Sequence, residues 1–426
     1  MRASQLFTRT NKDASREDVS RNAQLLTRAG YIDRLMAGVY SYLPLGLRVL
    51  NRIEDIIREE MNRIGAQEVL LPALQPREIW ERTGRWDKVD VLFKLQGQGD
   101  RDLALGPTHE EVVTPLVGNF IQSYRDLPTA VYQIQTKFRN EPRAKSGLLR
   151  GREFRMKDMY SFHADAADLD AFYERATQAY RRVYERCGLG PTTLLTYAAG
   201  GIFSKYSHEF QTITPYGEDI VYRLPGTDLA INKEIMSDLS VLSDLLPNYR
   251  PGDEAGFEEL KAIEVGNIFK LGTRFSDAFE VQFNDASGGR KPVCMGCYGL
   301  GPSRVLGTIA ETLSDEHGLV WPAEIAPFRV HLVSLARQQA EIDQCDAIYA
   351  DLVALGVEVF YDDRPGLPAG RKFMDADLMG IPLRLVVSKN SLAQNGVEWK
   401  ERRSTDTMVL PLEELRARLA PKGSRG

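Results

Sequence analysis

The chain has 426 residues, of which 43% are hydrophobic and 27% charged, and its formal net charge is −5. This composition fits a globular protein of two or three domains, and the acidic balance excludes a protein that binds nucleic acid over its whole surface. Because no run approaches the roughly 20 apolar residues of a membrane helix, and the start of the chain has no signal-peptide core, we expect a cytoplasmic protein with no membrane contact.

The four cysteines carry little metal signal. Cys294 and Cys297 form one C-M-G-C, whereas Cys187 and Cys345 stand alone. A zinc site needs a second cysteine or histidine pair at suitable spacing, so the sequence predicts no structural zinc. A thioredoxin-like redox pair is the alternative interpretation of C-M-G-C.

The first long element is a helix predicted over residues 46–65, which Gly65 ends. Its apolar residues recur at steps of three and four and are Leu50, Ile53, Ile57, Met61 and Ile64. A short strand is predicted over residues 68–72. Because Pro72 cannot donate to a sheet ladder, we expect this strand at a sheet edge or an interface.

An antiparallel hairpin is predicted over residues 130–162. Side chains from 130 to 141 alternate, which predicts a half-buried strand with a polar working face. The apolar face carries Tyr132, Ile134, Thr136 and Phe138, and the polar face Gln133, Gln135, Lys137, Arg139 and Glu141. Pro142 and Gly147 indicate a loop over 142–149, and the chain returns as a second strand over 150–162.

The rest of the chain predicts a second domain. A helix is expected over residues 168–187, and the irregular stretch 223–262 is interpreted as a small insertion outside the core. A domain break is expected near residues 322–327. Strands at 329–334, 357–361 and 383–387 then alternate with helices at 339–355 and 372–379, which predicts a compact α/β domain.

The hairpin carries the strongest candidate site. Arg139 and Glu141 lie two residues apart on one strand, and Arg150 and Phe154 four apart on the other, so each pair shares a face. Guanidinium groups match phosphate oxygens, a carboxylate accepts from an exocyclic amine, and a ring stacks on a base. The combination suits a nucleotide, and a surface ladder of ion pairs is the alternative.

A second glycine-rich candidate follows at residues 299–304. Gly299 and Gly301 would let the backbone approach a ligand, and Arg304 would lie in the first turn of a helix whose dipole favours anions. A simple helix-capping turn is the alternative.

A third candidate is the loop at residues 106–111. Thr108 and Glu110 could together hold a substrate ammonium group. From spacing alone, a helix cap is favoured instead, with Thr108 as N-cap and Glu111 completing a capping box.

Three segments resemble, in their order along the chain, the three motifs of the class II aminoacyl-tRNA synthetases. They are Gly65 to Pro72 after the long helix, F-R-N-E…R-G-R-E-F at 138–154, and G-L-G-P-S-R at 299–304. The finer pattern resembles the bacterial type of prolyl-tRNA synthetase over nearly the whole chain. The motifs that carry this resemblance are P-L-G-L-R-V at 44–49, G-P-T-H-E-E at 106–111, L-L-R-G-R-E-F-R-M-K-D-M-Y-S-F at 148–162, S-H-E-F at 207–210, E-V-G-N-I-F at 264–269, M-G-C-Y-G-L-G at 295–301 and D-D-R-P-G at 362–366.

The resemblance implies an α+β catalytic domain, in which helices flank an antiparallel sheet, followed by a C-terminal α/β anticodon-binding domain. The catalytic domain would span residues 1–222 and 263–325, and the anticodon-binding domain would span residues 326–426. Residues 223–262 would stand as a short insertion where many bacterial relatives carry a large domain that hydrolyses alanyl-tRNA. The resemblance therefore implies attachment of proline to tRNA(Pro) through prolyl-adenylate, without editing by the chain itself.

The resemblance also implies roles on the ATP side of the site. Arg139 would contact the α-phosphate, Glu141 the adenine amine, and Phe154 the adenine ring. Arg150 and Arg304 would hold the outer phosphates, next to Gly299 and Gly301. Arg139 and Arg304 would be the catalytic residues, and Mg²⁺ would arrive with ATP and not at a metal site of the protein.

On the proline side, Thr108 and Glu110 match the loop that grips the amino group, with Arg139 close by. Four further residues match the region that shapes the pocket for the proline ring, namely Phe162, His208, Glu209 and Phe210. The segment G-G-I-F-S-K-Y at 200–206 departs from the common spacing of the family.

Three partner surfaces follow from the resemblance. Arg143 and Lys145 in the hairpin loop would grip the tRNA acceptor end. The anticodon contacts would be Asp363, Arg364, Lys372 and Asp375. A homodimer would form through the helix at 46–65 and Pro72.

Two other interpretations remain open at this level. A threonine enzyme would need a zinc site with Cys and His ligands, and the five histidines offer no matching set. A catalytically silent paralogue would usually have lost the motif arginines or the substrate loop, yet all of these are present.

Overall fold

The computed structural model describes residues 1–13, 19–144, 146–200, 206–227, 229–245, 250 and 256–420. The chain divides into two compact units, which are described separately. The central unit comprises Met36–Val39 and Ile53–Thr308, and the C-terminal unit comprises Met1–Leu35, Tyr40–Arg52 and Ile309–Gly426. Residues from the start of the chain therefore group with its end, whereas we had predicted a single domain limit near residue 325.

Within the described residues, nine strands of the central unit form one sheet in the order β10-β9-β12-β11-β13-β16-β8-β7-β3. Neighbours are antiparallel except for the pairs β3–β7 and β12–β9. The strands are β3 (Gln67–Glu68), β7 (Thr129–Phe138), β8 (Glu153–His163), β9 (Thr193–Ala199), β10 (Tyr206–Ile213), β11 (Asp219–Arg223), β12 (Ala230–Asn232), β13 (Glu258–Gly272) and β16 (Cys294–Leu300). The predicted antiparallel sheet is confirmed, apart from these two parallel pairs.

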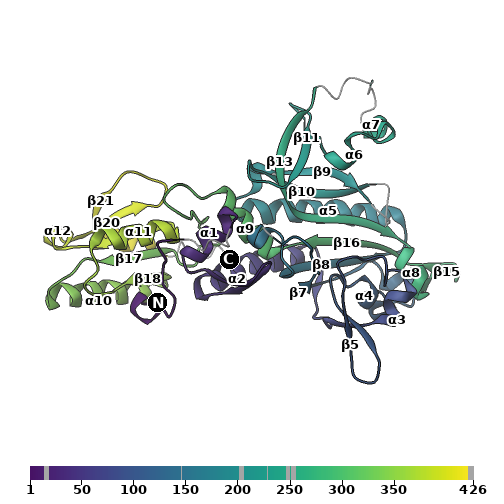
Figure 1. Cartoon of the computed structure of the whole chain (residues 1–426), viewed down its shortest axis with the longest axis horizontal. Helices are drawn as coiled ribbons and strands as arrows, with labels where there is room; N and C mark the ends of the chain where they lie inside the picture. The colour runs from purple at the N-terminus through teal and green to yellow at the C-terminus, as the bar shows by residue number, and fades with distance from the viewer. Residues whose placement is uncertain are drawn as a thin grey trace. The chain divides into compact units, whose positions relative to one another are not determined.

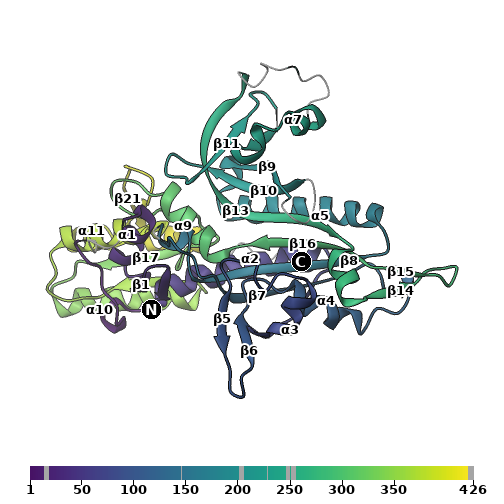
Figure 2. The ribbon, with the colours of Figure 1, turned by 45° about the vertical axis from the view of Figure 1, so that its right-hand side comes forward.

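Helix α5 (Ala166–Arg186) covers one face of this sheet (Figures 1 and 2). Its Tyr180 ring stacks on Phe210 of β10 at 5.0 Å between ring centroids, and Phe172 meets Tyr298 of β16 at 5.8 Å. Because side chains alternate along a strand, Cys297 points to the opposite face. There it joins a buried cluster with residues of α4 (Glu110–Gly118) and α8 (Arg274–Phe279).

The hairpin of β7 and β8 forms as predicted, with Lys137 opposite Phe154. Its polar face is nevertheless buried, since Gln133 and Lys137 have no exposed surface. Gln133 accepts from the backbone N–H of Leu71 at 3.0 Å and donates to Asp158 at 3.0 Å. We had expected a half-buried strand, and this polar face instead lies inside the protein because hydrogen bonds satisfy it.

The helix predicted at 46–65 is observed as α2 (Pro44–Arg63), and the division between the two units runs through it after Arg52. The strand predicted at 68–72 is only partly observed. Regular pairing ends at Glu68, after which the N–H of Val69 still donates to Tyr132. Pro72 is exposed beyond the end of the strand.

The stretch 223–262 is more ordered than predicted. It contains β12, the start of β13, and the short helices α6 (Lys233–Met236) and α7 (Leu239–Leu245). Ile231 has no exposed surface and forms a small apolar cluster with Ile235 and Leu242. Part of the segment interpreted as an insertion outside the core is therefore built into the main sheet.

The C-terminal unit contains the predicted α/β domain. Five described strands form a sheet in the order β18-β17-β19-β20-β21, parallel among the first three and antiparallel afterwards. The strands are β17 (Val330–Ser334), β18 (Val359–Asp362), β19 (Leu383–Val387), β20 (Gly396–Glu401) and β21 (Met408–Pro411). The accompanying helices are α10 (Gln339–Ala354), α11 (Ala369–Met379), α12 (Lys389–Ala393) and α13 (Leu412–Leu419).

Candidate active site

A cavity of about 350 Å³ opens on the central sheet, on the face away from α5. It is bounded by the β7–β8 hairpin, β13, β16, the loop before α4 and the start of α9 (Pro302–Thr312). The predicted residues that line it are Thr108, Glu110, Arg139, Glu141, Arg150, Phe154, Gly299, Gly301 and Arg304. The fold thus brings together three motifs that lie far apart in the sequence.

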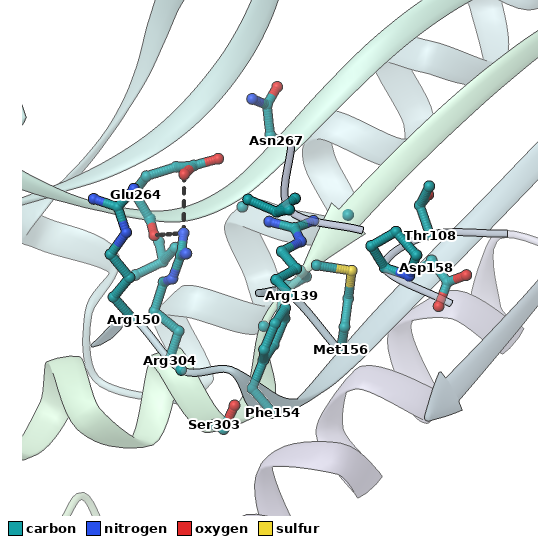
Figure 3. Close-up of a pocket in the computed structure, with 18 of the residues that line it drawn as sticks. Thr108, Arg139, Arg150, Phe154, Met156, Asp158, Glu264, Asn267, Ser303 and Arg304 are labelled. Atoms are coloured by element: carbon teal, nitrogen blue, oxygen red, sulfur yellow. Dashed lines mark hydrogen bonds and ion pairs between the residues drawn. The ribbon is translucent and has the colours of Figure 1, made fainter. Parts of the chain in front are cut away.

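Arg139 lies in the middle of the cavity, as Figure 3 shows, with Arg304 to one side and Thr108 to the other. Its guanidinium carbon is 5.3 Å from the centroid of the Phe154 ring, a cation–π arrangement. Burial and the nearby Arg304 cation lower the pKa of Arg139. An anionic group bound here would relieve both effects, so the site favours phosphate or carboxylate.

Arg304 lies in the first turn of α9, as predicted. Its Nη1 donates to both the backbone oxygen and the carboxylate of Glu264 at 2.9 Å. The neighbouring Ser303 is buried and donates to the backbone oxygen of Arg155 at 3.1 Å, which fixes the start of the helix against β8. Glu264 thus sets the direction of the Arg304 fork, a role that we had not predicted.

Glu141 and Arg150 form an ion pair across the hairpin, with Nε and Oε2 3.0 Å apart. The Arg150 side chain is half exposed, so this pair contributes at most about 1 kcal/mol to stability. Both residues line the cavity, so they share one surface as predicted, and their ion pair is the contact that the alternative interpretation had named.

Thr108 and Glu110 mark the other end of the cavity. The Thr108 hydroxyl donates to Glu110 Oε2 at 2.5 Å, and Cys297 Sγ donates to Glu110 Oε1 at 3.2 Å. The alternative capping-box interpretation is wrong, because the N-cap of α4 is His109. Glu111 instead pairs with Arg85 at 2.8 Å.

A buried polar network lies under this end of the cavity. Lys137 Nζ is 2.9 Å from Asp158 Oδ1 and 2.6 Å from His109 Nδ1. The Tyr160 hydroxyl donates to Asp158 at 2.9 Å and accepts from the backbone N–H of His109 at 3.0 Å. His109 also bonds the backbone oxygen of Pro72 at 2.9 Å. The network therefore fixes the backbone of the loop at residues 106–111.

The pKa values of the groups in this network indicate which of them carry charge. Burial by itself would raise the pKa of Asp158, but the adjacent Lys137 and His109 keep it below its usual range. Burial and the Lys137 cation lower the pKa of His109 to about 4. The histidine is therefore neutral at pH 7, and the ion pair joins Lys137 to Asp158.

Glu209 acts through a neighbour. It accepts from Asn232 and Gln211 at 2.9 Å and from Asn267 at 3.2 Å, and Asn267 lines the cavity. Burial and the adjacent Glu264 raise the pKa of Glu209 to about 7. Glu209 thus positions a wall of the cavity and does not face into it.

Three other residues predicted for the proline pocket do not line the cavity. His208 and Phe210 flank Glu209 on β10, so strand alternation turns them towards α5, where Tyr173 donates to or accepts from His208 at 2.8 Å. Phe162 is fully buried in the apolar cluster that also contains Leu271 and Cys297. The cavity instead has Met156 and Phe269 as apolar walls, and neither had been singled out in the sequence.

The predicted RNA-contacting residues differ in exposure. Arg143 is exposed in the hairpin loop, and Lys145 lies outside the described residues. In the C-terminal unit, Lys372 and Asp375 are buried, at 4% and 2% exposure, so they cannot touch an RNA base in this conformation. Asp375 pairs with Arg364 at 2.9 Å, and that arginine remains partly exposed.

Within the described residues, no group of three or more His, Cys, Asp or Glu side chains is placed to hold a metal ion. In the same part of the chain, no helix is both long and apolar enough to cross a membrane.

Comparisons with known proteins agree with this geometry. Residues 93–313 match the family model described as "tRNA synthetase class II core domain (G, H, P, S and T)", and residues 329–421 match the "Anticodon binding domain". An antiparallel sheet with an arginine-lined cavity, followed by a domain of this kind, is the architecture of a class II aminoacyl-tRNA synthetase.

Relatives define the family more closely. Proline–tRNA ligase of Dehalococcoides mccartyi is 35% identical, with 98% of each chain covered. The enzyme of the same name from Geobacillus kaustophilus is 33% identical, covering 97% of this chain and 98% of its own. The chain belongs to the proline–tRNA ligase family.

Solved structures show the same fold at lower identity. Giardia lamblia prolyl-tRNA synthetase in complex with prolyl-adenylate is 21% identical, with a TM-score of 0.76, over 96% of this chain and 78% of its own. The Cryptosporidium parvum enzyme complexed with halofuginone and AMPPNP is 20% identical, with a TM-score of 0.76, over 93% and 75%.

Proposed function

We propose that this chain attaches proline to tRNA(Pro) in two steps that consume ATP. The observation that carries the proposal is the position of Arg139, between the Arg304 end and the Thr108–Glu110 end of one cavity. The relatives that cover nearly the whole chain are named proline–tRNA ligases. Because the proposed substrate is tRNA, we place the protein in the cytoplasm.

In the first step, the carboxylate of proline attacks the α-phosphorus of ATP, and pyrophosphate leaves as prolyl-adenylate forms. A carboxylate is already a nucleophile, so the site needs positioning and charge stabilisation more than a general base. Arg139 supplies both, since its guanidinium can reach the carboxylate on one side and the phosphate on the other. Arg304 and Arg150 take the charge of the outer phosphates.

The amino group of proline would lie against Thr108 and Glu110, whose side chains hydrogen-bond to each other. Glu110 provides a carboxylate whose position is fixed by Thr108 and Cys297. The apolar side chains of Met156 and Phe269 enclose the space beside it. A fixed carboxylate can pair with the ammonium group of a small cyclic secondary amine, and the apolar walls can contact its ring.

Mg²⁺ carried by ATP fits the residues on the phosphate side. Glu264 offers one partly exposed carboxylate in the cavity beside Arg304. Mg²⁺ is usually held by one or two carboxylates together with substrate phosphates. When bound, the ion would neutralise charge on the phosphate oxygens, while Glu264 continues to orient Arg304.

In the second step, a terminal hydroxyl of the tRNA attacks the carbonyl carbon of prolyl-adenylate and AMP leaves. The exposed Arg143 lies in the hairpin loop, from which it could hold the acceptor end. The partly exposed Arg364 is the anticodon contact that we retain among the four predicted. Polar side chains of this kind read unstacked bases.

The substrate assignment predicts which amino acid drives ATP–pyrophosphate exchange. We expect exchange with proline to exceed exchange with alanine or threonine, because Thr108, Glu110 and the apolar walls match a five-membered ring with a cationic nitrogen. Measuring exchange for the three amino acids, with and without tRNA, checks this. Strongest exchange with threonine, or tRNA binding without exchange, would refute the proposal.

Fidelity gives a second prediction. The alignment to the Dehalococcoides mccartyi enzyme runs over 561 positions, whereas this chain has 426 residues, so more than a hundred positions of the alignment have no counterpart here. The described part of the segment at 223–262 contains β12, α6, α7 and the start of β13, all in the central unit. We therefore expect the purified chain to leave alanyl-tRNA intact. Rapid deacylation of alanyl-tRNA(Pro) in a thin-layer assay would contradict this.

Assembly gives a third prediction. Leu70 and Leu74 flank Pro72 and are 78% and 51% exposed, which is a high exposure for neighbouring leucines. We propose that α2 and the segment around Pro72 meet a second copy of the chain. Leu70→Glu should then lower the sedimentation coefficient from dimer to monomer at micromolar concentration. Leu95→Glu, on the hairpin of β5 (Phe93–Gln96) and β6 (Asp102–Leu105), is the control. Equal sedimentation of the wild type and both variants as monomers would exclude this dimer.

A further inference from the structure

The start of the chain lies against the C-terminal unit as an arm, which we define as residues 2–10. Arg2 pairs with Tyr361 of β18 in a parallel bridge. This strand is an outer strand of the five-stranded sheet, and Figure 1 shows the N-terminus near it. The Arg2 guanidinium lies over the rings of Tyr349 and Tyr361, at 5.3 and 5.0 Å, and donates to Asp346 at 3.0 Å. The arm thus covers a sheet edge that would otherwise be open.

The arm also holds both ends of the loop that joins β18 to α11. At the near end, the Asp363 carboxylate accepts from the Ser4 backbone N–H at 2.9 Å, the Ser4 hydroxyl at 2.8 Å and Arg2 at 3.3 Å. At the far end, Arg371 donates to the hydroxyl of the buried Thr10 at 3.3 Å. Asp363, which we had predicted to touch the anticodon, therefore ties the arm to the loop with both of its oxygens.

Between these anchors, the arm presents an aromatic ring and a cation. Phe7 is 77% exposed and Arg9 is exposed, although the backbone on either side is held in place. The N–H of Asn11 donates to the backbone oxygen of Arg28 at 2.8 Å, which fixes the chain just after Arg9. An exposed ring on an anchored backbone, next to a basic side chain, is a combination that suits single-stranded nucleic acid, by base stacking and phosphate contact.

We propose that the arm and the β18–α11 loop form one RNA-binding surface, in which Phe7 stacks on an unpaired base of the tRNA anticodon loop and Arg9 contacts a phosphate. The proposal rests on the function proposed above. RNA is favoured over a second copy of the chain for two reasons. The surface belongs to the unit whose residues 329–421 match an anticodon-binding domain, and one isolated ring is too little apolar area for a stable protein interface.

The test compares Phe7→Ala with Phe120→Ala, since Phe120 is 74% exposed but lies in the central unit after α4. We expect Phe7→Ala to raise the KM for tRNA(Pro) in aminoacylation roughly 5- to 100-fold, the effect of one lost stacking contact. The kcat and proline-dependent ATP–pyrophosphate exchange should stay within twofold of the wild type. Phe7→Tyr should restore the KM, and Phe120→Ala should leave it unchanged.

Arg9→Ala tests the phosphate contact separately. We expect it to flatten the dependence of log affinity for tRNA on log salt by about 0.7, as for one phosphate of a single strand. Unchanged KM in both arm variants would overturn the proposal, and so would a change in sedimentation of Phe7→Ala without a change in KM. Absence of exchange in the wild-type enzyme would instead refute the proposed function, so the two failures are distinguishable.

Discussion

Replacing Arg139 by alanine is expected to reduce proline-dependent ATP–pyrophosphate exchange by more than about a hundredfold. The guanidinium lies at the centre of the cavity, and burial and Arg304 lower its pKa, so an anionic group bound there would stabilise its charge. Removing a preorganised donor of this kind costs at least ~3 kcal/mol of transition-state stabilisation. Measurement of kcat/KM for exchange, with proline and ATP varied in turn, gives this number directly.

Two matched variants separate charge from geometry. Arg139→Lys keeps the cation but loses the planar fork that can reach two anions at once, so it should recover only part of the loss. Arg143→Ala removes an exposed arginine of the same hairpin and should leave exchange unaltered. It should raise only the KM for tRNA. Near-normal exchange in Arg139→Ala would show that the chemistry lies elsewhere.

Much of the fold could be predicted because local patterns carry it. The period of the apolar residues in α2 and the alternation along β7 define their elements without knowledge of any partner. The alternation of strand and helix patterns after residue 329 likewise predicted the elements of the C-terminal unit. Errors arose where a strand has two possible environments, since alternation alone could not tell that the polar face of β7 is buried.

The site was predictable residue by residue only where a motif contains it. Arg139, Phe154 and Arg304 were found through their segments, and the cavity contains all three. Glu264 orients Arg304 from 40 positions away, a contact that no local spacing predicts. Glu209 depends in the same way on Asn232, which lies in a stretch interpreted as an insertion.

The sequence analysis also did not resolve on which face of a strand each side chain lies. S-H-E-F at 207–210 was predicted as one group around the proline ring, yet a strand sends neighbours to opposite faces. Glu209 points to the cavity side and His208 and Phe210 towards α5. A similar limit applies to D-D-R-P-G, where Asp363 is taken by the arm and only Arg364 keeps partial exposure.

The buried pair of Lys137 and Asp158 gives the largest expected effect on stability. Neither side chain has more than 2% exposure, and the charged atoms are 2.9 Å apart. Removing one member of such a pair leaves an unpaired buried charge and typically costs 3–5 kcal/mol. We therefore expect Asp158→Asn and Lys137→Met each to lower the free energy of unfolding by about that amount. Urea-induced unfolding of the wild type and the two variants measures this loss of free energy.

The exposed pair of Lys94 and Asp87 provides the matched control. Its charged atoms are 2.8 Å apart, but the side chains are 42% and 83% exposed. Water solvates both partners after the pair is broken, so Asp87→Asn should cost less than about 1 kcal/mol. If Asp87→Asn lowers the free energy of unfolding as much as Asp158→Asn does, burial of the pair does not explain the loss of stability.

A double-mutant cycle then decides whether the pair acts as a unit. With both charges removed, no uncompensated ion remains, so Lys137→Met combined with Asp158→Asn should cost roughly 1–3 kcal/mol less than the sum of the single changes. Strict additivity would mean that the two side chains stabilise the protein independently.

Asp158 also accepts from Tyr160, whose oxygen holds the backbone of His109 between Thr108 and Glu110. The same variants should therefore raise the KM for proline more than the KM for ATP, because the disturbed backbone belongs to the loop that we propose holds the amino group.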